Sequence, residues 1–204
     1  MGRLRLFAAY LAAALVVYVL LFGAHWGEFA PYAWGATCDG ANFPDSVKLA
    51  NTDLVLNGLG VREATIFSVK VYVAGLYLAQ KGSNPGQILG ANQPWRLELH
   101  FVRDVGASDI RDAWQEGFEK SAPDKIAALQ ARIDVLKAAT TDFKVGQSLV
   151  FSNDPATGVT VAVNGAAGHS IAGADFATAL LGIWLGAKPP NADLKSGLLG
   201  GPCE

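Results

Sequence analysis

One arginine and one tyrosine have the residue types and the spacing that could hold an acidic ligand. Arg62 follows a glycine-rich stretch, and Tyr72 lies ten residues on, within an apolar, β-branched run. On an unbroken strand these two side chains would face one side of the sheet, because successive residues alternate. A guanidinium and a phenol framed by apolar residues can clamp a carboxylate or an enolate-like oxygen. The same spacing also fits a structural ion pair for Arg62 and ordinary core packing for Tyr72.

The residues around this pair predict strands. Residues 65–78 are rich in β-branched and aromatic side chains, which favour a buried strand. Before them, residues 46–49 and 54–56 flank a polar turn and predict a hairpin. The glycine-rich residues 57–60 predict a second turn, which would lead into the long strand.

The later chain predicts further strands and the helices that cover them. Alternating or apolar runs predict strands at residues 95–103, 143–151 and 159–163. Amphipathic or apolar periodicity predicts helices that begin near residues 108, 124 and 174, with short helical pieces near 85–89 and 193–199. Strands cluster early and late with helices between them, so the fold class is α+β.

Four motifs then occur in the order in which the chalcone isomerase superfamily has them. They are G-V-R at 60–62 with V-Y-V-A-G-L-Y-L at 71–78, F-V-R-D at 101–104, N-G at 164–165, and W-L-G at 184–186 followed by D-L-K at 193–195. The chain resembles this superfamily over roughly residues 45–200, and is most similar to its bacterial chalcone-isomerase-like branch. The resemblance implies a domain at 45–201 in which helices are layered on one face of an antiparallel sheet, an open-faced β-sandwich with a ligand cleft.

The resemblance also implies which residues line the cleft. Chalcone isomerases hold a phenolate with an arginine, and that position falls on Arg62. Five further positions of the chalcone isomerase site can be placed on this chain. The threonine, tyrosine, lysine, asparagine and late hydroxyl positions fall, in that order, on Tyr72, Ile110, Phe101, Gly117 and Ile183. We expect these residues, together with Trp114 on the same helix face, to bind ligand. A developing enolate would lose stabilisation worth several kcal/mol for each donor that is replaced.

Fatty-acid-binding members of the superfamily retain the arginine and carry tyrosine at the position of Tyr72. We therefore expect non-catalytic binding of a fatty acid or similar amphipathic carboxylate. One alternative is an isomerase or lyase that uses Arg62 and Tyr72 as electrophilic stabilisers on an unidentified substrate. Another is a structural or partner-binding module. A closed cleft beside Arg62 would favour a ligand, whereas a cleft filled by Phe101, Trp114 and Ile183 would favour the structural module.

The first residues predict a membrane segment. Arg3 and Arg5 precede the uncharged run 6–24, which at about 1.5 Å per residue just spans a bilayer core of about 30 Å. The basic start keeps the N-terminus cytoplasmic, so residues 1–24 would be an inner-membrane anchor for a periplasmic domain. The alternative is a signal peptide cleaved before Ala36, which would leave a periplasmic protein. Residues 25–44, rich in glycine, alanine and aromatic residues, would be a linker.

The cysteines, the net charge and the histidines limit the functions that the protein can have. Cys38 and Cys203 are the only cysteines, and both would lie outside the cytoplasm, so we predict that they form a disulfide. With a net charge of −2 and no basic run, the chain has no pattern typical of nucleic-acid binding. The three histidines are far apart and lack neighbouring ligands, so we expect no metal site and no cofactor.

Overall fold

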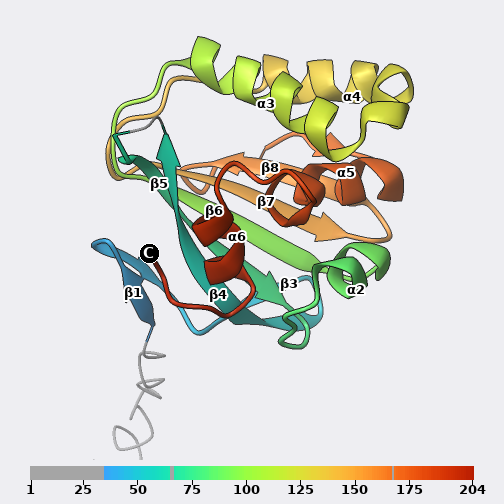
Figure 1. Ribbon diagram of the computed structural model, residues 1–204. Helices are drawn as coiled ribbons and strands as arrows, with labels where there is room; N and C mark the ends of the chain where they lie inside the picture. The colour runs from blue at the N-terminus through green and yellow to red at the C-terminus, as the bar shows by residue number, and fades with distance from the viewer. Residues whose placement is uncertain (1–34, 65–66, 167) are drawn as a thin grey trace, which may run out of the picture. The chain divides into compact units, whose positions relative to one another are not determined.

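The computed structural model of the chain describes residues 35–64, 67–166 and 168–204. Within these ranges, seven strands form an antiparallel sheet in which each strand pairs with the next one along the chain (Figure 1). The strands are β3 (Ser46–Leu49), β4 (Thr52–Ala64), β5 (Val69–Leu78), β6 (Trp95–Phe101), β7 (Ser148–Asp154), β8 (Gly158–Val163) and β9 (Ser170–Ile171).

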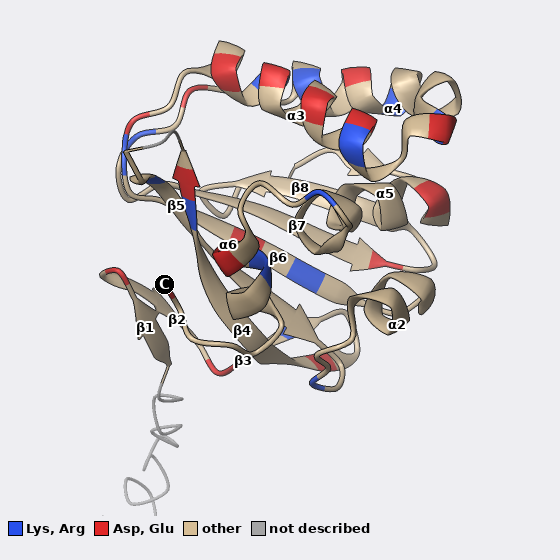
Figure 2. Cartoon of the chain, viewed as in Figure 1, with Lys and Arg blue, Asp and Glu red and all other residues tan. Residues whose placement is uncertain are grey.

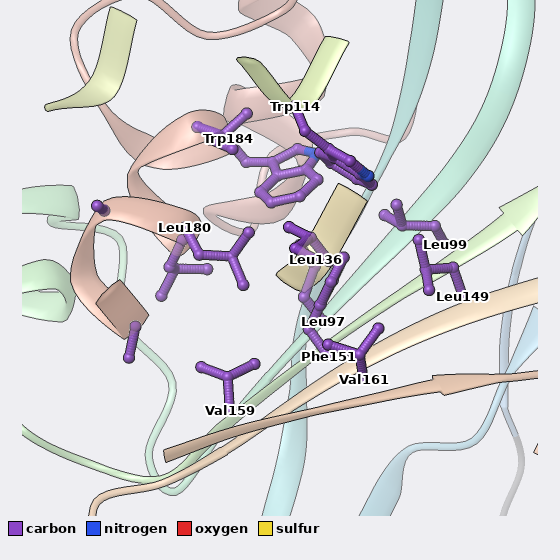
Figure 3. Close-up of a cluster of buried hydrophobic side chains, with 14 of the residues drawn as sticks. Leu97, Leu99, Trp114, Leu136, Leu149, Phe151, Val159, Val161, Leu180 and Trp184 are labelled. Carbon is purple, nitrogen blue, oxygen red and sulfur yellow. The ribbon is translucent and has the colours of Figure 1, made fainter. Parts of the chain in front are cut away.

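The helices pack on one face of this sheet, as predicted for an α+β fold. They are α2 (Pro85–Gly90), α3 (Ala107–Ser121), α4 (Ile126–Ala138), α5 (Ala174–Leu185) and α6 (Ala192–Leu198), with a short 3₁₀ turn, η1 (Pro123–Lys125), between α3 and α4. Figure 1 shows α3, α4 and α5 on the same side of the strands. Every second residue of β6 is buried, and these residues meet aromatic and aliphatic side chains from the helices (Figure 3). This alternation is the pattern from which the strand was predicted.

The opposite face of the sheet carries a second, smaller core. Residues of β5 alternate between the two faces, so that Ala74 and Leu76 join the helix-side core while Val73 and Tyr77 join the other. Two further strands, β1 (Ala36–Cys38) and β2 (Ala41–Phe43), pair as a hairpin. Their residues Cys38 and Phe43 are buried in this second core.

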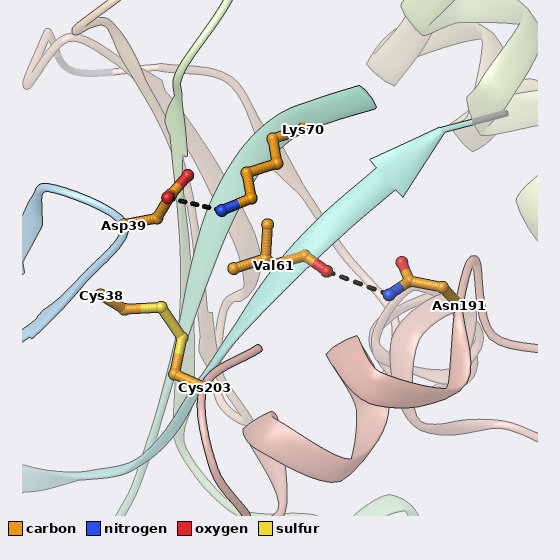
Figure 4. Close-up of a disulfide and its surroundings, with 6 residues drawn as sticks. All are labelled: Cys38, Asp39, Val61, Lys70, Asn191 and Cys203. Carbon is orange, nitrogen blue, oxygen red and sulfur yellow. Dashed lines mark hydrogen bonds and ion pairs between the residues drawn. A yellow bond between two sulfur atoms is a disulfide. The ribbon is translucent and has the colours of Figure 1, made fainter. Parts of the chain in front are cut away.

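The predicted disulfide is present. Cys38 of β1 bonds to Cys203, with their Cα atoms 6.2 Å apart, which lies within the usual range for disulfides (Figure 4). Nearby, the amide of Val61 donates to the carbonyl of Glu204, so the C-terminal tail is also held against β4. The compact unit therefore begins at Gly35, and residues 36–43 belong to it although we expected them in a linker.

The predicted turn at residues 57–60 is wrong, because β4 runs without interruption from Thr52 to Ala64. The glycines there serve another purpose: α6 lies directly against β4. A Cβ atom at Gly58 would come within 2.1 Å of the Gly197 carbonyl oxygen, and one at Gly60 within 2.5 Å of the Leu194 carbonyl oxygen. Side chains at these positions would force the helix off the strand.

Asn57 holds β4 in position beside these glycines. The register of β4 against β5 shifts between Leu56 and Gly58, and the Asn57 side chain donates to the carbonyls of Gly82 and Leu198. This bulge explains why Leu54 and Leu56 share the second core with Leu59 and Val61, which have the opposite parity.

The predicted long strand is also shorter than expected, since β5 begins at Val69. Residues 65–66 lie outside the described residues, as do the predicted anchor at 1–24 and residues 25–34 of the predicted linker. Across the part of the chain that the structure describes, none of the helices has the length and apolarity that a membrane crossing requires.

Candidate ligand-binding cavity

Arg62 and Tyr72 lie on adjacent strands rather than on one strand. Arg62 is near the end of β4, Tyr72 is near the start of β5, and the antiparallel register places them directly opposite each other. Directly opposed residues project to the same face of a sheet with their Cβ atoms about 5 Å apart. The expectation of a shared face therefore holds, although its premise of a single unbroken strand was wrong.

A cavity of about 380 Å³ lies on this face, bounded by the sheet, by α3, by the end of α5 and by the segment that follows α5. Its volume falls within the range of small-molecule sites, about 300–1,000 Å³. Every ligand-binding residue expected from the sequence contributes to its lining: Arg62, Tyr72, Phe101, Ile110, Trp114, Gly117 and Ile183. The side chains of Phe101, Trp114 and Ile183 form walls of the cavity and do not fill it.

The inner wall is apolar and well packed. Leu99 and Phe101 come from β6, and both are buried. Ile110 and Gly117 come from α3, where a Cβ atom at Gly117 would lie 3.0 Å from the side chain of Ile183 on α5. Glycine at this position therefore lets the two helices approach closely beside the cavity.

Arg62 is half-buried, and its guanidinium has N–H donors that no described residue accepts from. Its guanidinium donates to the carbonyl of the next residue, Glu63. Among the described residues, no carboxylate lies within ion-pair distance of Arg62. Glu116 of α3 shares the cavity lining, but it pairs with Lys120, which lowers the pKa of Glu116 more than Arg62 does. A structural ion pair thus does not account for Arg62.

Tyr72 receives a hydrogen bond from a residue that we did not expect in the site. The indole Nε1 of Trp184, on α5, donates to the Tyr72 hydroxyl oxygen over 3.0 Å. Burial raises the pKa of Tyr72 to about 12, against smaller lowering effects of the Trp184 hydrogen bond and the Arg62 charge. The phenol is therefore neutral around pH 7 and keeps a proton that it can donate.

The mouth of the cavity carries charges of both signs. Arg103, Asp104, Asp109 and Lys188 line it in addition to the Glu116–Lys120 pair, and all six residues are exposed. Figure 2 shows the mixture of acidic and basic residues along α3. Asp104 is paired with Lys144 outside the lining. Arg103 and Lys188 were not expected in the lining: β6 ends at Phe101, two residues before the predicted end of that strand, and Lys188 lies in a connection that has no periodic pattern.

Comparisons with known proteins agree with this architecture. A family model described as chalcone isomerase-like matches residues 35–200. The crystal structure of an Arabidopsis thaliana fatty-acid binding protein is similar, with a TM-score of 0.62 and 18% sequence identity over 78% of this chain and 92% of that chain. No curated protein matches the sequence. The family match spans most of the chain, and the protein belongs to the chalcone isomerase-like family.

Proposed function

We propose that the protein binds a fatty acid or a similar amphipathic carboxylate in the cavity beside Arg62, without transforming it. The observation that carries this proposal is the opposed Arg62–Tyr72 pair, which faces a cavity of about 380 Å³ while Arg62 has no carboxylate partner among the described residues. A guanidinium offers only donors, and it prefers planar, bidentate acceptors such as a carboxylate. The buried aliphatic and aromatic walls would take the hydrocarbon chain.

The lining supports binding over catalysis. Chalcone isomerases carry polar side chains at four positions that are apolar in this cavity. These positions fall on Phe101, Ile110, Gly117 and Ile183. None of these side chains can donate a hydrogen bond to a developing oxyanion. The similar Arabidopsis protein is named a fatty-acid binding protein, which supports the same proposal at the level of the fold.

We also propose that the domain works outside the cytoplasm, anchored by residues 1–24. The Cys38–Cys203 disulfide supports this location, because disulfides persist in oxidising compartments. Membrane fractions should retain the full chain after extraction at high pH. Recovery of soluble protein that begins near Ala36 would show cleavage instead.

The test of binding is a displacement titration with a fluorescent fatty acid on the full chain. Dodecanoic acid should displace the probe, and its methyl ester should displace it at least tenfold less well, because esterification removes the charge that Arg62 recognises. Equal affinities would contradict the proposal. A second arm follows naringenin chalcone by absorbance: cyclisation above the uncatalysed rate would favour the isomerase alternative.

A further inference from the structure

Trp184 occupies an unusual position for a polar contact. It is 1% exposed in the helix-side core, where its ring meets Trp114 and Phe151 at centroid distances of 6.0 Å and 5.9 Å. Its Nε1 nevertheless reaches the Tyr72 hydroxyl at the cavity wall. An indole nitrogen can only donate a hydrogen bond, so the direction of this bond is fixed.

The direction of this bond determines what Tyr72 can do. A tyrosine hydroxyl has one proton and can accept through its oxygen lone pairs. Trp184 binds the one lone pair of this oxygen that accepts well, since the other is conjugated with the ring, and among the described residues no acceptor is found for the Tyr72 proton. Because Tyr72 lines the cavity, its proton is available to a ligand there. Arg62, directly opposite, also offers only donors.

We propose that Trp184 is a positioning residue that makes Tyr72 an obligate donor, so that the site selects head groups that only accept hydrogen bonds. An ionised carboxylate satisfies both Arg62 and Tyr72. A fatty alcohol brings a hydroxyl proton that finds no acceptor on either side chain, and buried unpaired donors are costly. The role of Trp184 rests on the proposed function, since it requires a head group beside Arg62.

The test compares dodecanoic acid with 1-dodecanol in the displacement titration on the full chain. In Trp184→Phe, the Tyr72 hydroxyl loses its fixed donor and can turn to accept from the alcohol. The ratio of acid affinity to alcohol affinity should fall about threefold to tenfold, the worth of one neutral hydrogen bond. In a Tyr72→Phe background, the same Trp184→Phe change should leave this ratio where it is.

Trp114→Phe is the matched control. Trp114 also lines the cavity, but its Nε1 donates to the Thr140 hydroxyl over 3.1 Å and not to Tyr72. The substitution removes an indole from the same wall, so it should weaken both ligands together and preserve their ratio. A selectivity loss in Trp114→Phe equal to that in Trp184→Phe would show that wall packing, and not the hydrogen bond, sets the preference.

A second measurement needs no ligand and does not depend on the stability of the Trp184 variant. The Trp184 indole resonance in a ¹⁵N–¹H spectrum should move in Tyr72→Phe, because its acceptor is lost. An unmoved resonance, or an unchanged acid-to-alcohol ratio in Trp184→Phe, would overturn the positioning role while leaving the proposed function intact. Failure of the wild type to bind either ligand would overturn both.

Discussion

Removal of the Cys38–Cys203 disulfide should strongly destabilise the domain. The two cysteines are 165 residues apart in the sequence, so the bond closes almost the whole described chain into one loop. The loop-entropy relation gives about 5 kcal/mol at 25 °C for a loop of this size. This is an upper figure, since compact denatured states lower the gain, and we expect a loss of about 3–5 kcal/mol.

The bond also holds local structure. β1 pairs with β2, and Asp39 between them forms an ion pair with Lys70 of β5 at 2.7 Å (Figure 4). This ion pair is exposed, so it should do little to hold the hairpin in place once the disulfide is removed. We therefore expect the hairpin to detach from the second core when the disulfide is removed.

The assay is guanidinium chloride unfolding of the full chain, followed by near-ultraviolet circular dichroism, for the wild type and for the double variant Cys38→Ala, Cys203→Ala. The midpoint should fall in the double variant, and reduced wild type should unfold at the same concentration as the double variant. Equal midpoints for oxidised wild type and double variant would refute the loop argument. So would two titratable thiols in wild type made in an oxidising compartment.

Three further predictions concern single side chains. Gly117→Ala should lower the affinity for dodecanoic acid in the displacement titration, because the new methyl group crowds Ile183 beside the cavity. The stability of the fold should be nearly unchanged, because alanine favours the helix by about 1 kcal/mol. Tyr77→Phe should be neutral or stabilising by about 1 kcal/mol in thermal unfolding, because the Tyr77 hydroxyl is buried without a partner among the described residues. Arg132 lowers the pKa of Asp175 to about 2, so Asp175 stabilises the fold above its unfolded pKa near 3.9. The stability advantage of wild type over Asp175→Asn, under about 1 kcal/mol for so exposed a pair, should shrink as the pH falls below about 4 and should vanish only below about 2.

Periodicity predicted the elements that bury one face. β6 alternates along its whole length, and the buried residues of α3, Ile110, Trp114, Gly117 and Phe118, recur at the spacing of one helix face. Such elements report their surroundings locally, because each side chain meets either core or solvent.

Long-range packing is what the sequence could not reveal. The turn expected at residues 57–60 was wrong because these glycines are explained by α6, which follows far along the chain and lies against β4. The hairpin at 36–43 has strands of only three residues, too short for any periodic signal, and it joins the domain through the disulfide to Cys203 and the buried side chain of Phe43.

In the candidate site, some residues could be inferred from the sequence and others could not. Arg62 and Tyr72 share a face through the register of two strands, whereas their spacing suggested one strand. The family resemblance, and not spacing, located Phe101 and Ile183 in the lining. Trp184 was recognised only as part of a motif, since an apolar helix gives no sign of which indole nitrogen meets a cavity.

The central claim is that Arg62 and Tyr72 hold a carboxylate, and a bound fatty acid labelled with ¹³C at its carboxyl carbon tests it most directly. Saturable binding should give one protein-bound carboxyl resonance, and its pH titration gives the pKa of the bound acid. In Arg62→Ala this pKa should rise, because the guanidinium that stabilises the ionised form is gone. Arg62→Lys should lie between the two, since an ammonium keeps the charge without the planar fork. A bound carboxyl resonance whose pKa is the same in wild type and Arg62→Ala would contradict the account.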